Sequence, residues 1–84
     1  MPLNNKFYLA KEENKYYIKS DESDIKLEIN EPGAYIYEKL LEGLPAKKIA
    51  SKMCLKYVAD PVELETDILE FLVILKRYGM YYAM

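Results

Sequence analysis

The sequence predicts an α+β domain in which a three-stranded antiparallel sheet is followed by three helices. The first third of the chain contains short runs of aromatic and β-branched residues, and polar segments separate these runs. Beyond it, apolar residues recur at helical spacing, with a proline near each expected helix start and a glycine after two of the expected ends. The change of period, from two to about 3.6 residues, predicts strands first and helices second.

The strands are expected in three short runs. These runs are Phe7–Leu9, Tyr16–Ile18 and Ile25–Ile29. The third run alternates strictly, with Leu27 between two isoleucines on one face and Lys26 and Glu28 on the other, which is typical of a strand with one buried face. The polar segments Lys11–Lys15 and Ser20–Asp24 are expected to form turns. Three strands so close in sequence predict an antiparallel meander, which leaves two edges to be covered or used.

The first two helices have clear start and stop residues. Asn30 is a favourable N-cap, and Gly43 is expected to end the first helix. The expected core residues of this helix are Ala34, Tyr37, Leu40 and Leu41. The second helix is expected after Pro45, with lysines along its outer face. Its expected inward residues are Ile49, Ala50, Met53 and Tyr57.

The third helix is expected to begin at the N-cap Asp60 and to end at Gly79. The wide apolar face that should close the core consists of Leu64, Ile68, Phe71, Leu72, Leu75 and Tyr78. At about 100° per residue, a second apolar stripe forms elsewhere on the helix, and Ile74 falls on its opposite flank. This second stripe consists of Val62, Leu69 and Val73, beside Thr66 and Lys76.

Size and composition exclude several classes of function. With 84 residues and a net charge of −2, the chain is expected to form one domain, residues 1–84. It contains no histidine, and Cys54 is its single cysteine, so we expect no catalytic residue, no metal site and no cofactor. The sequence has no recognisable signal peptide or membrane span, and a single cysteine suits a reducing compartment. The chain is therefore expected to be cytoplasmic, with no membrane partner.

The order and spacing of these elements resemble the PqqD-like family, the recognition elements (RREs) for precursors of ribosomally synthesised and modified peptides (RiPPs). The matching motifs are Ile29-Asn30, Gly33-Ala34, Ile36-Tyr37, Glu42-Gly43 and Ile49-Ala50, then Asp67 through Phe71-Leu72 and Leu75 to Gly79-Met80. Two positions depart from the family pattern. Gly43 comes about one position late, and Pro45 replaces the serine or threonine that usually caps the second helix.

The resemblance implies a winged helix-turn-helix-like fold and a peptide-binding function. In this family, the leader segment of the precursor is captured as an added β-strand against the third strand, in a groove shared with the third helix. The resemblance therefore implies a non-catalytic peptide chaperone that presents its precursor to a separate enzyme. The expected partner is a radical SAM maturase, or a leader peptidase or cyclase of a lasso-type system. Because the chain ends soon after Gly79, this enzyme is expected to act in trans.

The expected peptide-binding residues lie on the third strand and on the second stripe of the third helix. They are Ile25, Lys26, Leu27, Glu28, Ile29, Val62, Thr66, Leu69, Val73 and Lys76. In this hypothesis the apolar residues of the stripe line the groove, and Lys76 is available to an acidic residue of the peptide. The same stripe is also compatible with packing on the sheet, with a homodimer contact, or with scattered apolar surface.

Two other functions stay open at this point. One is a winged-helix module that binds DNA or associates with transcription, and the lysines of the second helix would favour it. The helix expected to enter a DNA groove is the third, however, and it carries four carboxylates between Glu63 and Glu70. These charges oppose phosphate binding, so we expect no nucleic-acid partner. The other alternative is a small protein–protein adaptor unrelated to peptide maturation.

Overall fold

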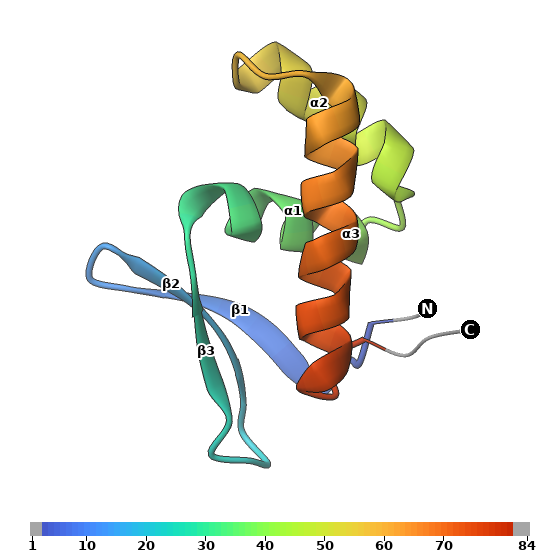
Figure 1. Ribbon diagram of the computed structural model, residues 1–84. Coiled ribbons are helices and arrows are strands. Elements are labelled where there is room, and N and C mark those ends of the chain that lie inside the picture. Colours follow the sequence, from blue (N-terminus) through green and yellow to red (C-terminus); the bar gives the residue numbers. More distant parts are fainter. Residues whose placement is uncertain (1–2, 82–84) are drawn as a thin grey trace.

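A computed structural model of the chain describes residues 3–81 and shows a three-stranded sheet followed by three helices (Figure 1). The elements are β1 (Phe7–Glu12), β2 (Lys15–Ser20), β3 (Lys26–Ile29), α1 (Glu31–Leu41), α2 (Ala46–Lys56) and α3 (Pro61–Arg77). The strands pair antiparallel in the order β1-β2-β3, so the predicted meander is confirmed. Helix α1 lies between the sheet and α2, and α3 runs past all of them (Figure 1).

The strand bounds differ from the prediction in all three strands. Strands β1 and β2 extend beyond the predicted runs, and Ser20, predicted to lie in a turn, ends β2. The first turn is shorter than Lys11–Lys15, because β1 and β2 pair as far as Glu12 and Lys15 and leave a two-residue loop with Glu13 at φ 60°. The third strand begins one residue later than predicted. The backbone N–H of Ile25 donates to Ser23 Oγ (3.1 Å), so it is not available for strand pairing.

The helix ends follow the predicted capping residues. The side chain of Asn30 accepts a hydrogen bond from the backbone N–H of Gly33 (2.8 Å), and that of Asp60 accepts from Val62 (2.9 Å). Gly43 adopts φ 88° just after α1, a conformation that favours glycine. At the start of α2, Pro45 offers no side-chain cap, and its carbonyl accepts the first helical N–H groups instead.

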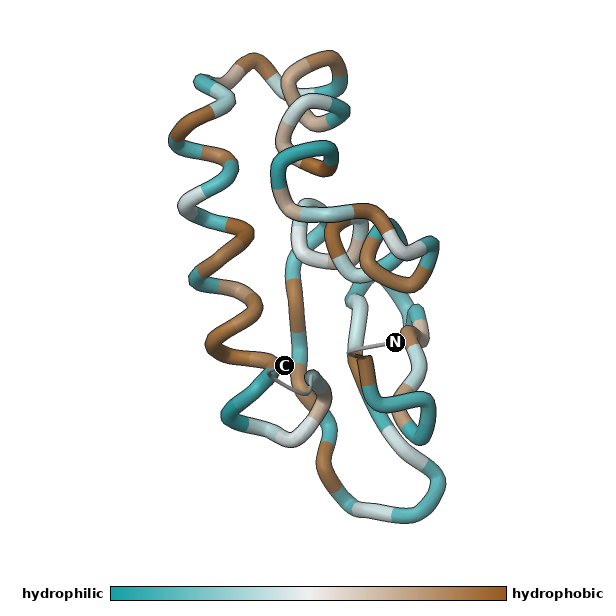
Figure 2. Tube along the Cα trace, turned by 90° about the vertical axis from the view of Figure 1, so that its right-hand side faces the viewer, coloured by the Kyte–Doolittle hydropathy of each residue, from teal (hydrophilic) through white to brown (hydrophobic). Residues whose placement is uncertain are grey.

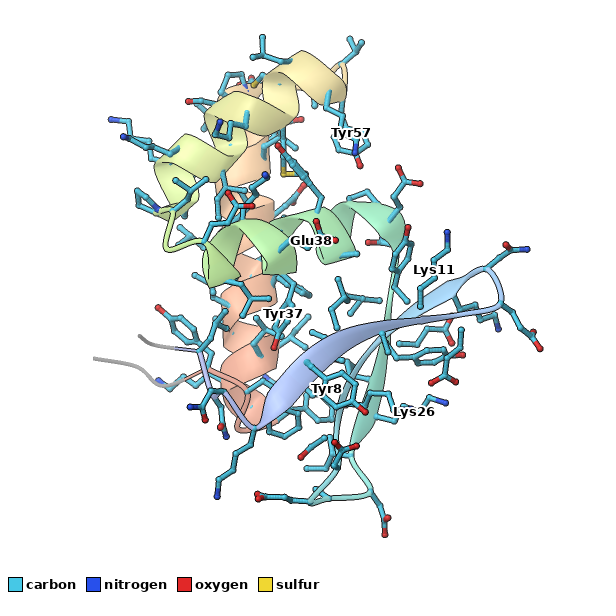
Figure 3. All side chains as sticks on the ribbon, turned by 180° about the vertical axis from the view of Figure 1, so that it is seen from behind. Tyr8, Lys11, Lys26, Tyr37, Glu38 and Tyr57 are labelled. Atoms are coloured by element: carbon cyan, nitrogen blue, oxygen red, sulfur yellow. The ribbon has the colours of Figure 1, made fainter. Side chains whose placement is uncertain are left out.

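The core lies between the sheet and the helices. Its fully buried side chains are Tyr37, Ile18, Ile49, Ile68, Leu75 and Met80. Tyr37 points from α1 toward the sheet (Figure 3), and its hydroxyl is buried without a hydrogen-bond partner among the described residues. The two ends of the described segment meet beside α3, where the backbone N–H of Asn4 donates to the carbonyl of Met80 (2.9 Å).

Some expected core positions are wrong. Leu41 and Tyr78 are both 43% exposed, because each lies at the end of its helix, where the chain turns away from the core. Leu72 is only half-buried. Ile36 was not predicted as core but is buried, because α1 is covered by the sheet on one side and by α2 on the other, which buries a wider stripe. Within residues 3–81, no helix is long and apolar enough to cross a membrane.

Candidate functional site

Strand β3 forms one edge of the sheet. It pairs with β2 along one side, from Tyr16 opposite Ile29 to Lys19 opposite Lys26. No strand of residues 3–81 pairs with its other side. The backbone N–H and C=O groups on that side are therefore available to an added strand. Leu27 and Ile29 are half-buried against the core, as the alternation predicts.

The edge strand is held by a carboxylate that connects all three strands. Glu12 of β1 accepts hydrogen bonds from the Nζ atoms of Lys19 (2.7 Å) on β2 and Lys26 (2.9 Å) on β3. These two hydrogen bonds, that from Lys19 first, lower the pKa of Glu12. Lys26 Nζ also lies 4.2 Å from the centre of the Tyr17 ring, on the face of β3 away from the core (Figure 3). Lys26 therefore links the strands on this outer face, and its side chain does not line the hollow between β3 and α3.

A groove runs between β3 and α3. The two elements lie alongside each other, upright in both views (Figures 1 and 2). At the level of the strand, a hollow of about 240 Å³ opens between them. Its lining residues are Leu27, Glu28, Ile29, Asn30, Phe71 and Ile74. The side chains of Phe71 and Ile74 form its helix wall, so this wall is apolar.

A larger hollow continues the groove beyond the end of β3. It measures about 490 Å³ and shares Asn30, Phe71 and Ile74 with the first. Its other lining residues come from the start of α1, the end of α2 and the middle of α3; they are Pro32, Gly33, Ile36, Met53, Tyr57, Leu64, Asp67 and Glu70. The hydroxyl of Tyr57 is buried and has no hydrogen-bond partner within the described part of the chain.

Gly33 allows the start of α1 to sit between the two walls of the groove. A Cβ atom at this position would lie 3.3 Å from the Cβ of Ile29, 3.1 Å from the cap oxygen of Asn30 and 3.7 Å from the Phe71 ring. The first two contacts are tighter than ordinary van der Waals contact. The missing side chain therefore lets β3, α1 and α3 approach one another where the two hollows meet.

The charged lining residues of the groove are all acidic. They are Glu28 at the strand edge and Asp67 and Glu70 on α3. Glu28 lies 4.0 Å from Lys15, whereas Asp67 and Glu70 make no ion pair within residues 3–81. The groove thus combines apolar walls with two exposed carboxylates that make no ion pair within the described residues.

The side chains predicted to form the helix wall do not line the groove between β3 and α3. None of Val62, Thr66, Leu69, Val73 and Lys76 lines either hollow. All five are exposed, and the Thr66 hydroxyl donates back to the carbonyl of Val62 (3.1 Å). At about 100° per residue, Leu69 and Val73 lie roughly half a turn around α3 from Phe71 and Ile74. The periodicity correctly separated Ile74 from the second stripe, but it assigned the wrong face to the strand.

The groove offers binding chemistry and no recognisable catalytic centre. In the described residues, no three or more His, Cys, Asp or Glu side chains are placed to hold a metal ion. Cys54 is half-buried against the core. What the site presents is an edge strand, an apolar helix face and two carboxylates.

These features define a class of small α+β domain with an open sheet edge beside a helix. The family model described as coenzyme PQQ synthesis protein D (PqqD) matches residues 11–80, and the chain belongs to this family. A comparison with curated proteins found no match.

Two solved structures share the fold. One is TbiB1 in complex with the TbiA(beta) leader peptide, at 21% sequence identity and a TM-score of 0.84, covering 100% of both chains. The other is lasso peptide synthetase B1 complexed with the leader peptide, at 22% identity and a TM-score of 0.85, covering 96% of this chain and 95% of that one. The predicted order of three strands and three helices is the order in this fold.

Proposed function

We propose that this chain binds the leader segment of a ribosomally made precursor peptide and presents it to a separate modifying enzyme. The observation that carries the proposal is the groove between the open edge of β3 and the apolar face of α3. An extended peptide that pairs with an edge strand gains main-chain hydrogen bonds, and adjoining pockets select its side chains. Membership of the PqqD family and the leader peptides named in both similar structures support this function.

The proposed contacts follow the groove as the structure has it. The backbone of Lys26–Ile29 pairs with the peptide, and Leu27, Phe71 and Ile74 contact its apolar side chains. The second stripe, together with Thr66 and Lys76 beside it, lies outside this proposed interface. The protein itself is proposed to be non-catalytic, so the chemistry belongs to the partner. A leader peptidase or cyclase of lasso type is supported by the similarity to lasso peptide synthetase B1, and a radical SAM maturase by the family resemblance.

A titration tests the binding step. The probe is a fluorescently labelled leader from a short precursor gene beside the gene for this chain, with a scrambled leader and duplex DNA as controls. We expect saturable binding of the leader and of neither control. DNA should not bind because the carboxylates on the exposed side of α3 oppose phosphates. Binding of the scrambled peptide with equal affinity, or submicromolar sequence-specific binding of DNA, would contradict the proposal.

A second assay tests presentation. The modifying enzyme encoded beside the precursor gene is assayed on the full-length precursor, with and without the chain. We expect the chain to raise the rate or lower the apparent KM, and to convert nothing alone. Equal rates with and without it would overturn the presenting role.

A further inference from the structure

The larger hollow holds an unusual combination of groups for an otherwise apolar groove. Asp67 and Glu70 lie on its α3 side with no ion pair in residues 3–81, and no lysine or arginine lines either hollow. The ion pairs that the structure describes lie on the sheet, beside its strands or at the end of α1, and the one that reaches the groove is Glu28–Lys15, at the strand edge. A peptide entering this hollow therefore meets uncompensated negative charge.

The hollow also suits the stem of a long side chain. Ile36 and Met53 are buried apolar residues at its base, and Phe71 separates it from the strand-level hollow. Tyr57 adds an aromatic ring to the lining. Lysine and arginine side chains pack their methylene stems on apolar surface and keep their charged ends at a polar rim. Arginine additionally stacks on aromatic rings and binds carboxylates with two parallel hydrogen bonds.

The spacing of the two hollows matches that of an extended peptide. Phe71 follows Asp67, and Ile74 follows Glu70, by four residues, which is about 6 Å along a helix. Two residues of a strand advance by about 6.6 Å, and their side chains point the same way. Strand β3 and helix α3 run alongside each other (Figure 2). Consecutive inward residues of a peptide paired with β3 would therefore face first Phe71 and Ile74 and then Asp67 and Glu70.

We infer that the groove selects leader peptides with a basic residue, arginine in preference to lysine, two positions from an apolar residue. The apolar side chain packs on Phe71 and Ile74, and the basic side chain enters the larger hollow and reaches Asp67 and Glu70. This inference rests on the proposed function and specifies its substrate class. It reverses the expectation that Lys76 meets an acidic residue of the peptide.

The test uses a displayed library of random twelve-residue peptides, selected on the immobilised full chain. We expect enrichment of arginine or lysine two positions from an apolar residue. Selection on the Asp67→Lys variant should instead enrich aspartate or glutamate at that position. The best peptide is then synthesised, together with a version that carries glutamine in place of its basic residue.

Matched variants assign the preference to the groove. Glu70→Gln should lower the affinity for the basic peptide at least tenfold and leave the affinity for the glutamine version nearly unchanged. The same substitution at Glu65, on the far side of α3 and lining a different hollow, should change neither. Enriched peptides whose binding is lost in Ile74→Asp but which show no basic preference would overturn this inference and leave the proposed function standing. No enrichment, or enrichment that Ile74→Asp does not affect, would overturn both.

Discussion

Two exposed faces of α3 carry apolar side chains, and only one of them faces the sheet edge. Ile74, on the groove face, is 41% exposed, while Leu69 and Val73, on the outer face, are 51% and 56% exposed. Exposure alone therefore does not distinguish a binding surface from bare helix. The difference is what lies opposite, because the groove face looks across a hollow at β3 and the outer face lines neither hollow of the groove. The peptide-binding groove proposed for this fold needs both the edge strand β3 and the helix α3, and the apolar residues of the helix alone do not define it.

Substitutions on the buried face of α3 show how large a stability loss is expected when a core side chain is removed. Ile68 is fully buried, so Ile68→Ala should lower the free energy of unfolding by roughly 2–5 kcal/mol through lost burial and a cavity. Leu72→Ala should cost less, because Leu72 is only half-buried. Thermal or urea unfolding measures both. Equal losses for the two variants would mean that the core extends further around α3 than described.

The contrast between the two exposed faces is tested by one substitution made on each. Ile74→Asp places an unpaired charge against the bound peptide and should weaken leader binding by about 2 kcal/mol, or about thirtyfold. Val73→Asp is its matched control and should leave the affinity unchanged, because Val73 lies outside the groove. Both variants should melt near the parent temperature, since both side chains are exposed. A larger binding loss for Val73→Asp would move the site to the outer face.

A substitution at Tyr37 should change the stability of the fold and leave peptide binding unchanged, which is the reverse of the effect expected for Ile74→Asp. Its buried hydroxyl has no partner among the described residues, so Tyr37→Phe should raise the free energy of unfolding by about 1 kcal/mol and leave leader affinity unchanged. Burial raises the pKa of Tyr37, so above about pH 10 this hydroxyl ionises in the unfolded chain before it ionises in the folded one, and the parent protein loses stability as pH rises. The advantage of the variant should therefore grow at high pH. Calorimetric unfolding at pH 7 and above pH 10 measures it, and a clearly less stable variant would show that the hydroxyl is paired.

The smallest effect is expected on the strand side of the groove. Hydrogen bonds from Lys19 and Lys26 lower the pKa of Glu12, so its contribution to stability is present above the unfolded value of about 4.5 and is lost as pH falls through the lower folded value. Glu12→Gln should cause a slight loss of melting temperature at pH 7 that disappears below that folded value. Amide exchange in β3 should quicken in the variant at pH 7. A difference that persists unchanged at low pH would mean that the charge of Glu12 is not what braces the edge.

The sequence predicted the fold more fully than the site because the two depend on different information. Alternation in β3 and the caps Asn30 and Asp60 are local signals, and the structure confirms each of them. The groove wall depends on how α3 is rotated against β3, which is set by distant core residues such as Ile18 and Met80. Periodicity separated the second stripe from the buried residues Leu64, Ile68 and Leu75, but it placed Phe71 with the core and could not tell which face meets the strand.

The central claim is that a leader peptide pairs with β3 and lies against the groove face of α3. Its most direct test is an NMR titration of the isotopically labelled chain with the leader peptide, which follows backbone amide exchange and side-chain methyl signals together. We expect slowed exchange within Lys26–Ile29 and shifted methyl signals for Leu27 and Ile74, with those of Leu69 and Val73 unmoved. Unchanged exchange in β3, with shifts confined to the outer face of α3, would contradict the account.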